Sequence, residues 1–186
     1  MSVELKRRRF TVDEYHRMGE VGILTRGDRV ELIDGEIIEM TAMDAPHLRC
    51  VIFLTETFIR GLEGRALVAP QLPLRLTNWT EPEPDIALLR PPLDRYGQMI
   101  PASRDVLLAV EVADTTLRYD RGVKLPRYAA ADVPEVWIVD LNGEAVEVYR
   151  EPSTDGYRES RRLERGDAVA PAAFPDLVIA VHDILG

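Results

Sequence analysis

The stretch VLLAVEVADTTLRYDRGVKLPRYAAADVPEVWIVDL, residues 106–141, decides the fold that we expect for this chain. Its first part, 106–112, is an almost continuous apolar run, the pattern of a strand that is covered on both faces. A helix is expected from about 118 to 131, where Pro126 should kink the helix or tighten its start. A second strand is expected over 134–141. Strand, helix and strand in succession favour one crossover unit in a sheet covered by helices.

The N-terminal part is expected to begin with a short helix and a hairpin. Thr11 and Glu14 have the spacing of a capping box, which predicts that a helix begins near residue 12. Residues 30–40, VELIDGEIIEM, indicate two strands around Asp34-Gly35. That dipeptide suits a type I′ turn, in which both central residues need positive φ.

The longest helix is expected from about His47 to Leu62, with Gly61 and Gly64 as its stop. Its apolar residues recur at helical spacing, which predicts a helix. These residues are Leu48, Ile52, Leu54, Phe58, Ile59 and Leu62.

Further strands are expected over 66–76, 86–89, 144–150, 157–163 and 177–181. Pro70 and Pro73 should keep the first of these near an edge of the sheet. Asn142-Gly143 predicts a tight hairpin turn between 134–141 and 144–150. We therefore expect a single domain over residues 1–186, of the α/β to α+β class, with a mixed twisted β-sheet flanked by helices and an N-terminal arm at about 1–10.

A net charge of −9 argues against tight nonspecific binding of nucleic acid, which normally depends on lysine and arginine. Two basic groups, Lys6–Arg9 and the trio Arg161, Arg162 and Arg165, could still guide a phosphate polymer locally. The single Cys50 excludes an intrachain disulfide and fits a reducing compartment. No apolar run approaches the ~20 residues that span a bilayer. We therefore expect a cytoplasmic protein with no membrane partner.

Two acids stand where buried strands are expected. Asp85 opens the apolar run of EPEPDIALLR, and Glu111 lies inside DVLLAVEVAD. A buried carboxylate without a partner is costly, so a metal ion or Lys124 should compensate both acids. Mg²⁺ needs only one or two carboxylates when water and a substrate phosphate complete its octahedron. A plainer reading stays open, in which Asp85 caps a turn and Asp120 and Lys124 form a surface i,i+4 ion pair.

Lys124 could serve phosphodiester hydrolysis in two ways. It could add positive charge where the transition state becomes more negative. It could also orient or deprotonate the attacking water, provided that burial lowers its pKa.

The run PEPDIALL, followed by LLAVEVADTTLRYDRGVKLPRYAAADVPEVWIVDL, resembles the Uma-type restriction endonucleases of the PD-(D/E)XK nuclease superfamily. The resemblance extends to VELIDGEIIEM and to GDAVAP and FPDLVIAVHDIL, so it covers nearly the whole chain. It implies a restriction-endonuclease-like fold and a Mg²⁺- or Mn²⁺-dependent endonuclease that hydrolyses DNA. We also expect a homodimer, because two sites related by a two-fold axis cut both strands most simply.

The resemblance also implies roles for individual residues. Asp85 is the acid of the PD element and Glu111 the second acid, and these two would bind the metal ion. The superfamily lysine normally stands two residues after the second acid, where this chain has Ala113, which points to Lys124 on the next helix. Glu31 matches a recurrent acid that would hold metal-bound water or a second ion. Its alternative is an outward strand carboxylate.

Other interpretations remain open from the sequence. His47, at the start of the long helix, would touch phosphate or Glu31, or it has no catalytic part. Tyr128, one turn beyond Lys124, is expected to pack rather than react. The acidic net charge and Ala113 support a catalytically inactive binding or assembly module on the same fold. A hydrolase of RNA or structured DNA is a third possibility, since fold does not decide substrate.

Overall fold

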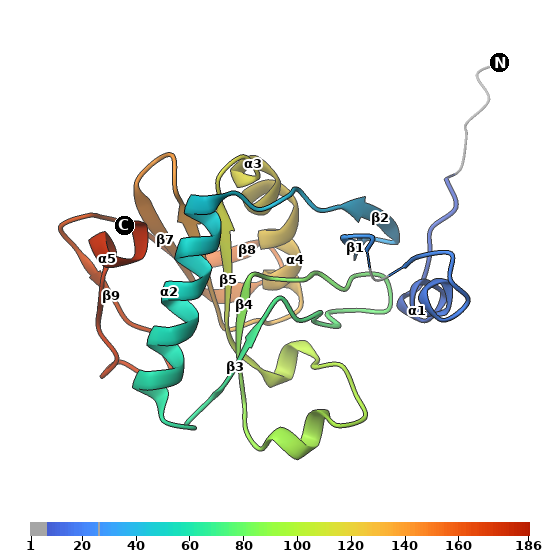
Figure 1. The fold of residues 1–186 in the computed structure, drawn as a ribbon, viewed down its shortest axis with the longest axis horizontal. Helices are drawn as coiled ribbons and strands as arrows, with labels where there is room; N and C mark the ends of the chain where they lie inside the picture. Colours follow the sequence, from blue (N-terminus) through green and yellow to red (C-terminus); the bar gives the residue numbers. More distant parts are fainter. Residues whose placement is uncertain (1–6, 26) are drawn as a thin grey trace.

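A six-stranded mixed sheet forms the centre of the molecule and has helices on both faces (Figure 1). Its strands lie in the order β3-β4-β5-β6-β7-β8, and only β5 and β6 run parallel. Their bounds are β3 Leu67–Pro70, β4 Ile86–Leu89, β5 Val106–Ala113, β6 Glu135–Asp140, β7 Ala145–Ser153 and β8 Gly156–Glu164. The helical segment between β5 and β6 is the predicted crossover, and the predicted mixed sheet is confirmed.

The computed structural model describes residues 7–25 and 27–186, so residues 1–6 of the predicted arm, including Lys6, lie outside the described residues. The helices are α1 Val12–Glu20, α2 Ala45–Leu62, α3 Leu117–Tyr119, α4 Leu125–Ala130 and α5 Val181–Leu185, with 3-10 turns η1 Leu93–Tyr96 and η2 Ser103–Asp105 and the π-helical turn η3 Asp120–Lys124. Two small sheets pair β1 Val30–Ile33 with β2 Glu36–Glu39 and β9 Ala168–Val169 with β10 Ile179–Ala180. No helix in these two ranges has the length and apolar character to cross a membrane.

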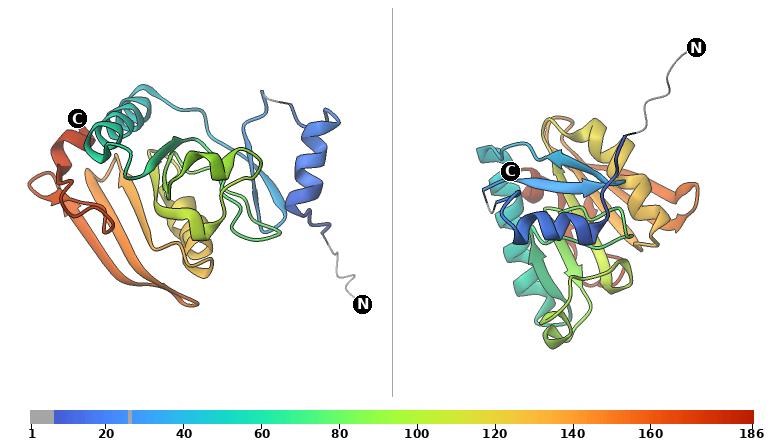
Figure 2. Two further views of the ribbon diagram at one scale, coloured as in Figure 1. Left: turned by 90° about the horizontal axis from the view of Figure 1, so that it is seen from below. Right: turned by 90° about the vertical axis from the view of Figure 1, so that its right-hand side faces the viewer.

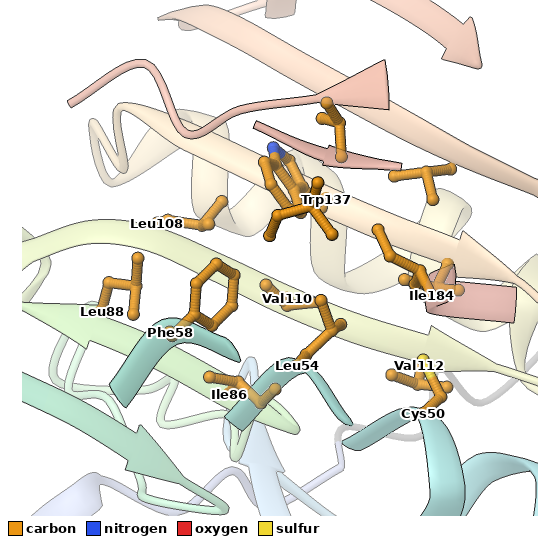
Figure 3. Packing of buried hydrophobic residues seen from close by; sticks show 14 of the residues in the cluster. Cys50, Leu54, Phe58, Ile86, Leu88, Leu108, Val110, Val112, Trp137 and Ile184 are labelled. Atoms are coloured by element: carbon orange, nitrogen blue, oxygen red, sulfur yellow. The ribbon is translucent and has the colours of Figure 1, made fainter. Parts of the chain in front are cut away.

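Alternation along β5 gives the sheet a core on each face. Leu108 and Val110 pack with Trp137 in a buried cluster beneath α2 (Figure 3). Ala109 belongs to a second buried cluster, which includes residues of α4. Burying one large apolar side chain contributes about 1.5–3 kcal/mol, so both clusters stabilise the position of β5. Glu111 follows the alternation of Ala109 and therefore faces α4.

The long helix α2 buries some of the apolar residues whose spacing predicts it and leaves others exposed. The buried residues are His47, Cys50, Val51, Leu54, Phe58 and Leu62. Leu48, Ile52 and Ile59 are 46%, 56% and 57% exposed. Together with the half-buried Thr55 they follow one another at helical spacing, and we call these four residues the exposed α2 stripe, although only the three apolar members are exposed. The predicted helix is confirmed, and the sheet covers only its neighbouring face, which leaves these three residues outside the core.

Most other predicted elements are present, some with shorter bounds. Strands β4 to β8 match their predicted positions. Asp34 and Gly35 have φ values of 52° and 79°, which confirms the type I′ turn between β1 and β2. The strand predicted over 66–76 ends at Pro70, and the strand predicted over 177–181 keeps only residues 179–180 because α5 begins at residue 181.

The turn predicted at Asn142-Gly143 is wrong. The loop has four residues, 141–144, and its positive φ of 49° falls on Glu144. The side chain of Asn142 donates to the backbone carbonyl and the carboxylate of Asp114, at 2.7 and 2.8 Å. The Asn142 side chain therefore links this loop to the residue that follows β5, and the loop does not form a two-residue turn.

Candidate active site

The predicted site residues come from five segments that converge beside the crossover. Glu31 lies in β1, His47 in the first turn of α2, Asp85 just before β4, Glu111 in β5 and Lys124 at the end of η3. The β1–β2 hairpin stands to one side of the main sheet (Figure 2). A cavity of about 320 Å³ opens between these segments, and all the predicted residues except Glu111 line it.

Glu111 and Lys124 form a buried ion pair. The Lys124 Nζ lies 2.7 Å from Glu111 Oε1, and each residue is 4% exposed. The Tyr128 hydroxyl donates to the same Oε1 at 2.6 Å, because Lys124 and Tyr128 are four residues apart and face the same way. The alternative of a surface ion pair between Asp120 and Lys124 is therefore wrong, since Lys124 points into the protein.

Glu31 is the second carboxylate that lies beside the Lys124 ammonium. Its Oε2 lies 3.4 Å from the Lys124 Nζ and accepts the Glu83 backbone N–H at 3.1 Å. Its Oε1 accepts the Tyr119 hydroxyl at 3.1 Å. Glu31 is 3% exposed, so the alternative of an outward strand carboxylate is wrong.

Asp85 is held between a strand and a helix. Its Oδ2 accepts the Val112 backbone N–H at 2.8 Å and lies 3.1 Å from His47 Nε2. The acid is therefore fixed across neighbouring strands and does not merely cap a turn. Among protein groups, His47 contacts Asp85, whereas Glu31 was the protein partner considered for it from the sequence. Burial disfavours the imidazolium, but the hydrogen bond and charge of Asp85 outweigh burial and raise the pKa of His47.

A π-helical turn aims Lys124 at the acids. The Leu125 N–H donates to the Asp120 carbonyl five residues back, which defines the widened turn. Pro126 follows immediately and has no N–H to donate to the Gly122 carbonyl. The crossover helix therefore widens at this point, where a kink or a tightened start was expected. Such π turns occur frequently at functional sites.

Lys124 lies among three carboxylates, those of Glu111, Glu31 and Asp120. Burial raises the pKa of Glu111 well above its usual value, Lys124 opposes the rise, and Asp120, Asp85 and Glu31 add to it. Burial disfavours the Lys124 ammonium, but Glu111, Glu31 and Asp120 outweigh burial and raise the lysine pKa. Lys124 is thus held as a cation. Deprotonation of water by Lys124 would need a lowered pKa, so that expectation is not supported by its surroundings.

The sequence interpretation missed two hydroxyls of the site. Tyr128 packs in the core as expected, but its hydroxyl also bonds to Glu111. The i,i+4 spacing from Lys124 was the signal that could have revealed this contact. Tyr119 bonds to Glu31 across 88 residues of sequence, and no local pattern indicates such a contact.

The donor set of the cluster fits a hard divalent cation. In the described part of the chain, no three His, Cys, Asp or Glu side chains are grouped so as to hold a metal ion alone. Mg²⁺ commonly takes one or two carboxylates and fills its other positions with water and phosphate oxygens. The contacts of Asp85 use Oδ2 and those of Glu111 use Oε1, which leaves a second oxygen on each carboxylate. A cation would also offset the excess negative charge of the buried acids.

Comparison with known proteins identifies both the fold and the family of this chain. A crystal structure from Anabaena variabilis, described as a putative nuclease belonging to DUF820, matches with a TM-score of 0.74 and 16% identity over 95% of this chain and 97% of that chain. This likeness confirms the predicted restriction-endonuclease-like fold. No curated protein matches the chain. The model of the Uma2 family, described as "Putative restriction endonuclease", matches residues 12–182. The chain therefore belongs to the Uma2 family, as its motifs predict.

Proposed function

We propose that this protein is a metal-dependent endonuclease that hydrolyses DNA phosphodiester bonds. The observation that carries the proposal is the buried Lys124, which lies 2.7 Å from Glu111 and 3.4 Å from Glu31 and lines the same cavity as Asp85. A buried lysine among acids is costly to maintain, and a phosphate site is the chemistry that uses both charges. Membership of the Uma2 family supports the same reaction class.

In this proposal, Asp85 and Glu111 hold Mg²⁺ or Mn²⁺. The bound ion would activate water and offset charge on the phosphate. Lys124 supplies a fixed positive charge to the phosphate oxygens as their negative charge grows. Glu31 is auxiliary and orients the lysine ammonium. His47 fixes the rotamer of Asp85 through the contact between Nε2 and Oδ2.

We further propose that the protein acts as a homodimer that pairs two copies of the exposed α2 stripe. The four positions of the stripe keep the same spacing when their order is reversed, so two antiparallel helices can match residue against residue. Arg49 and Glu56 are exposed on one flank, and reversal brings the arginine of one copy toward the glutamate of the other. One helix face is smaller than the standard ~800 Å² per partner, so association should be weak.

Sedimentation over a range of protein concentrations tests the dimer. Wild type is expected to associate as concentration rises, and Ile52→Glu is expected to stay monomeric. Ile23→Glu is the matched control, because Ile23 is 69% exposed and lies outside the stripe. A dimer that survives Ile52→Glu, or a wild type that never associates, would contradict this interface.

Cleavage of single- and double-stranded DNA with Mg²⁺ or Mn²⁺ tests the enzyme. Asp85→Asn and Glu111→Gln should abolish metal-dependent products. Glu135→Gln is the control for folding, because Glu135 is also a buried carboxylate of the sheet but is bound to Arg150 and Trp137 outside the cavity. Equal cleavage by wild type and Asp85→Asn would refute the assignment of the site.

The rival candidate is a binding or assembly module that lacks turnover. It is favoured by the net charge of −9 and by the fact that Glu111 and Lys124 already neutralise each other. Metal titration followed by calorimetry separates the two. An enzyme should bind Mg²⁺ or Mn²⁺ and lose that binding in Asp85→Asn, whereas a module should show no metal binding at this site.

A further inference from the structure

The residues proposed for catalysis are almost inaccessible from outside. Asp85 is 9% exposed, Lys124 is 4% exposed and Glu31 is 3% exposed. A double helix carries its phosphates on a convex outer surface. Such a surface reaches groups on a ridge or in a broad groove more easily than nearly buried groups that line a cavity of about 320 Å³. A phosphate on a separated strand would enter this cavity more readily than a phosphate of a duplex.

The cavity has the size and lining for one nucleotide. Pockets that enclose a small ligand span about 300–1,000 Å³, and this cavity lies at the lower end of that range. Four apolar residues of β2 and the segment that follows it line the cavity beside Glu39, Thr41 and Asp44 of the same stretch, and we call these four the apolar wall: Ile38, Met40, Ala42 and Met43. Isoleucine and methionine are side chains that proteins use to press against or between bases.

Hydrogen bonds at the base of the β1–β2 hairpin hold the segment that carries the apolar wall. The Met40 N–H donates to the Arg29 carbonyl at 2.8 Å, and an Arg29 guanidinium nitrogen donates to the Thr41 carbonyl at 3.3 Å. Arg29 lines the same cavity and is exposed, so a flanking phosphate could reach its charge from the solvent side. The apolar wall and Arg29 thus line the same cavity as Glu31, Asp85 and Lys124.

We infer that the substrate is DNA that is unpaired at the scissile nucleotide, as in a single strand, a flap or a loop. This inference rests on the proposed function for the chemistry at the cavity floor. The phosphate reaches Lys124, the base lies against Ile38 and Met40, and Arg29 meets the next phosphate. Such a substrate is held mainly by enclosure of one nucleotide, so it suits a chain of net charge −9 better than a duplex gripped by many cations.

Binding to the uncleaving Asp85→Asn variant tests the inference separately from catalysis. The probe is an oligonucleotide with one 2-aminopurine, offered as a single strand, as a hairpin with the probe in its loop, and as a full duplex. The single strand and the loop should bind at least about tenfold more tightly than the duplex, with a rise in fluorescence as the base leaves its neighbours. Equal binding of all three, or no binding of any, would overturn the inference.

A wall variant identifies the cavity as the place of binding. Asp85→Asn/Met40→Glu should bind the single strand about tenfold more weakly, a loss of about 1.4 kcal/mol, since the apolar contact with the base is removed. Asp85→Asn/Met99→Glu is the matched control, because Met99 is 52% exposed and does not line this cavity. Equal weakening by both changes would show a mere charge effect and overturn the assignment.

Cleavage by wild type then distinguishes the two proposals. Products from the single strand and loop but not from the duplex support both. Selective binding of unpaired DNA without metal-dependent cleavage supports the nucleotide cavity and refutes the proposed enzyme. Cleavage of the duplex as fast as the single strand supports the enzyme and overturns the inference about its substrate.

Discussion

The buried pair of Lys124 and Glu111 permits a quantitative test of the site. In Lys124→Met the methionine keeps much of the side-chain volume but removes the charge that lies 2.7 Å from Glu111 and 3.4 Å from Glu31. Removal of one partner from a buried pair costs about 3–5 kcal/mol. We therefore expect the free energy of unfolding at pH 8 to fall by about 3–5 kcal/mol, a large share of the about 5–15 kcal/mol available to a domain.

The same variant should show a characteristic pH dependence. Burial already raises the pKa of Glu111, and Lys124→Met removes the lysine that opposes this rise. A carboxyl with a raised folded-state pKa contributes stability that is fully present below its unfolded pKa of about 4.3 and is lost as pH rises through the folded pKa. The deficit of the variant should therefore shrink as the pH falls from 8 toward 5.

Urea unfolding followed by tryptophan fluorescence measures this deficit, since Trp137 is fully buried. The double variant Lys124→Met/Glu111→Gln should recover most of the loss, because a neutral glutamine can still accept from Tyr128. Arg60→Met, which removes an exposed charge of α2, should cost about 1 kcal/mol or less. The reasoning is refuted if Lys124→Met is as stable as wild type at pH 8, or if the double variant is no more stable than the single one.

Three further predictions concern the framework of the site. Burial disfavours the Glu147 carboxylate, but the hydrogen bonds from Arg121, Tyr149 and Arg162 and the charge of Arg121 together outweigh burial and lower the Glu147 pKa. Its stability contribution is present above the unfolded pKa of about 4.3 and is lost as pH falls through the folded pKa, so Glu147→Gln should lower the melting temperature at pH 7 and progressively less toward acid. Gly35→Ala should cost more than about 1 kcal/mol, because its φ is 79° and an added Cβ would lie 2.9 Å from the Phe10 carbonyl oxygen; an unchanged thermal melt would contradict this. Pro126→Ala restores an N–H and should let the π-helical turn relax toward an α-helix, so cleavage should fall while circular dichroism stays unchanged. Full cleavage by this variant would show that the widened turn is unnecessary.

Several parts of the fold could be predicted because local sequence expresses them directly. The continuous apolar run of β5 requires cover on both faces, whatever lies beyond it in the chain. Asp34-Gly35 forms its turn because both residues tolerate positive φ without help from neighbours. The candidates Asp85, Glu111 and Lys124 were also accessible, since acids in apolar strands need compensation and the surrounding motifs resemble one family.

Only the tertiary structure decided which side chains meet. The Tyr119 hydroxyl donates a hydrogen bond to Glu31, which is 88 residues away in the sequence, and His47 contacts Asp85 and not Glu31. Both contacts form because the β1–β2 hairpin and α2 converge beside β5. The exposed α2 stripe has the same apolar character as the buried face of that helix, and its exposure depends on where the sheet lies. The cavity likewise belongs to no single segment. Periodicity records the preference of each residue for burial, whereas distances between segments follow from packing the whole chain, which is why the sequence indicated the candidate acids and lysine but not their enclosed arrangement.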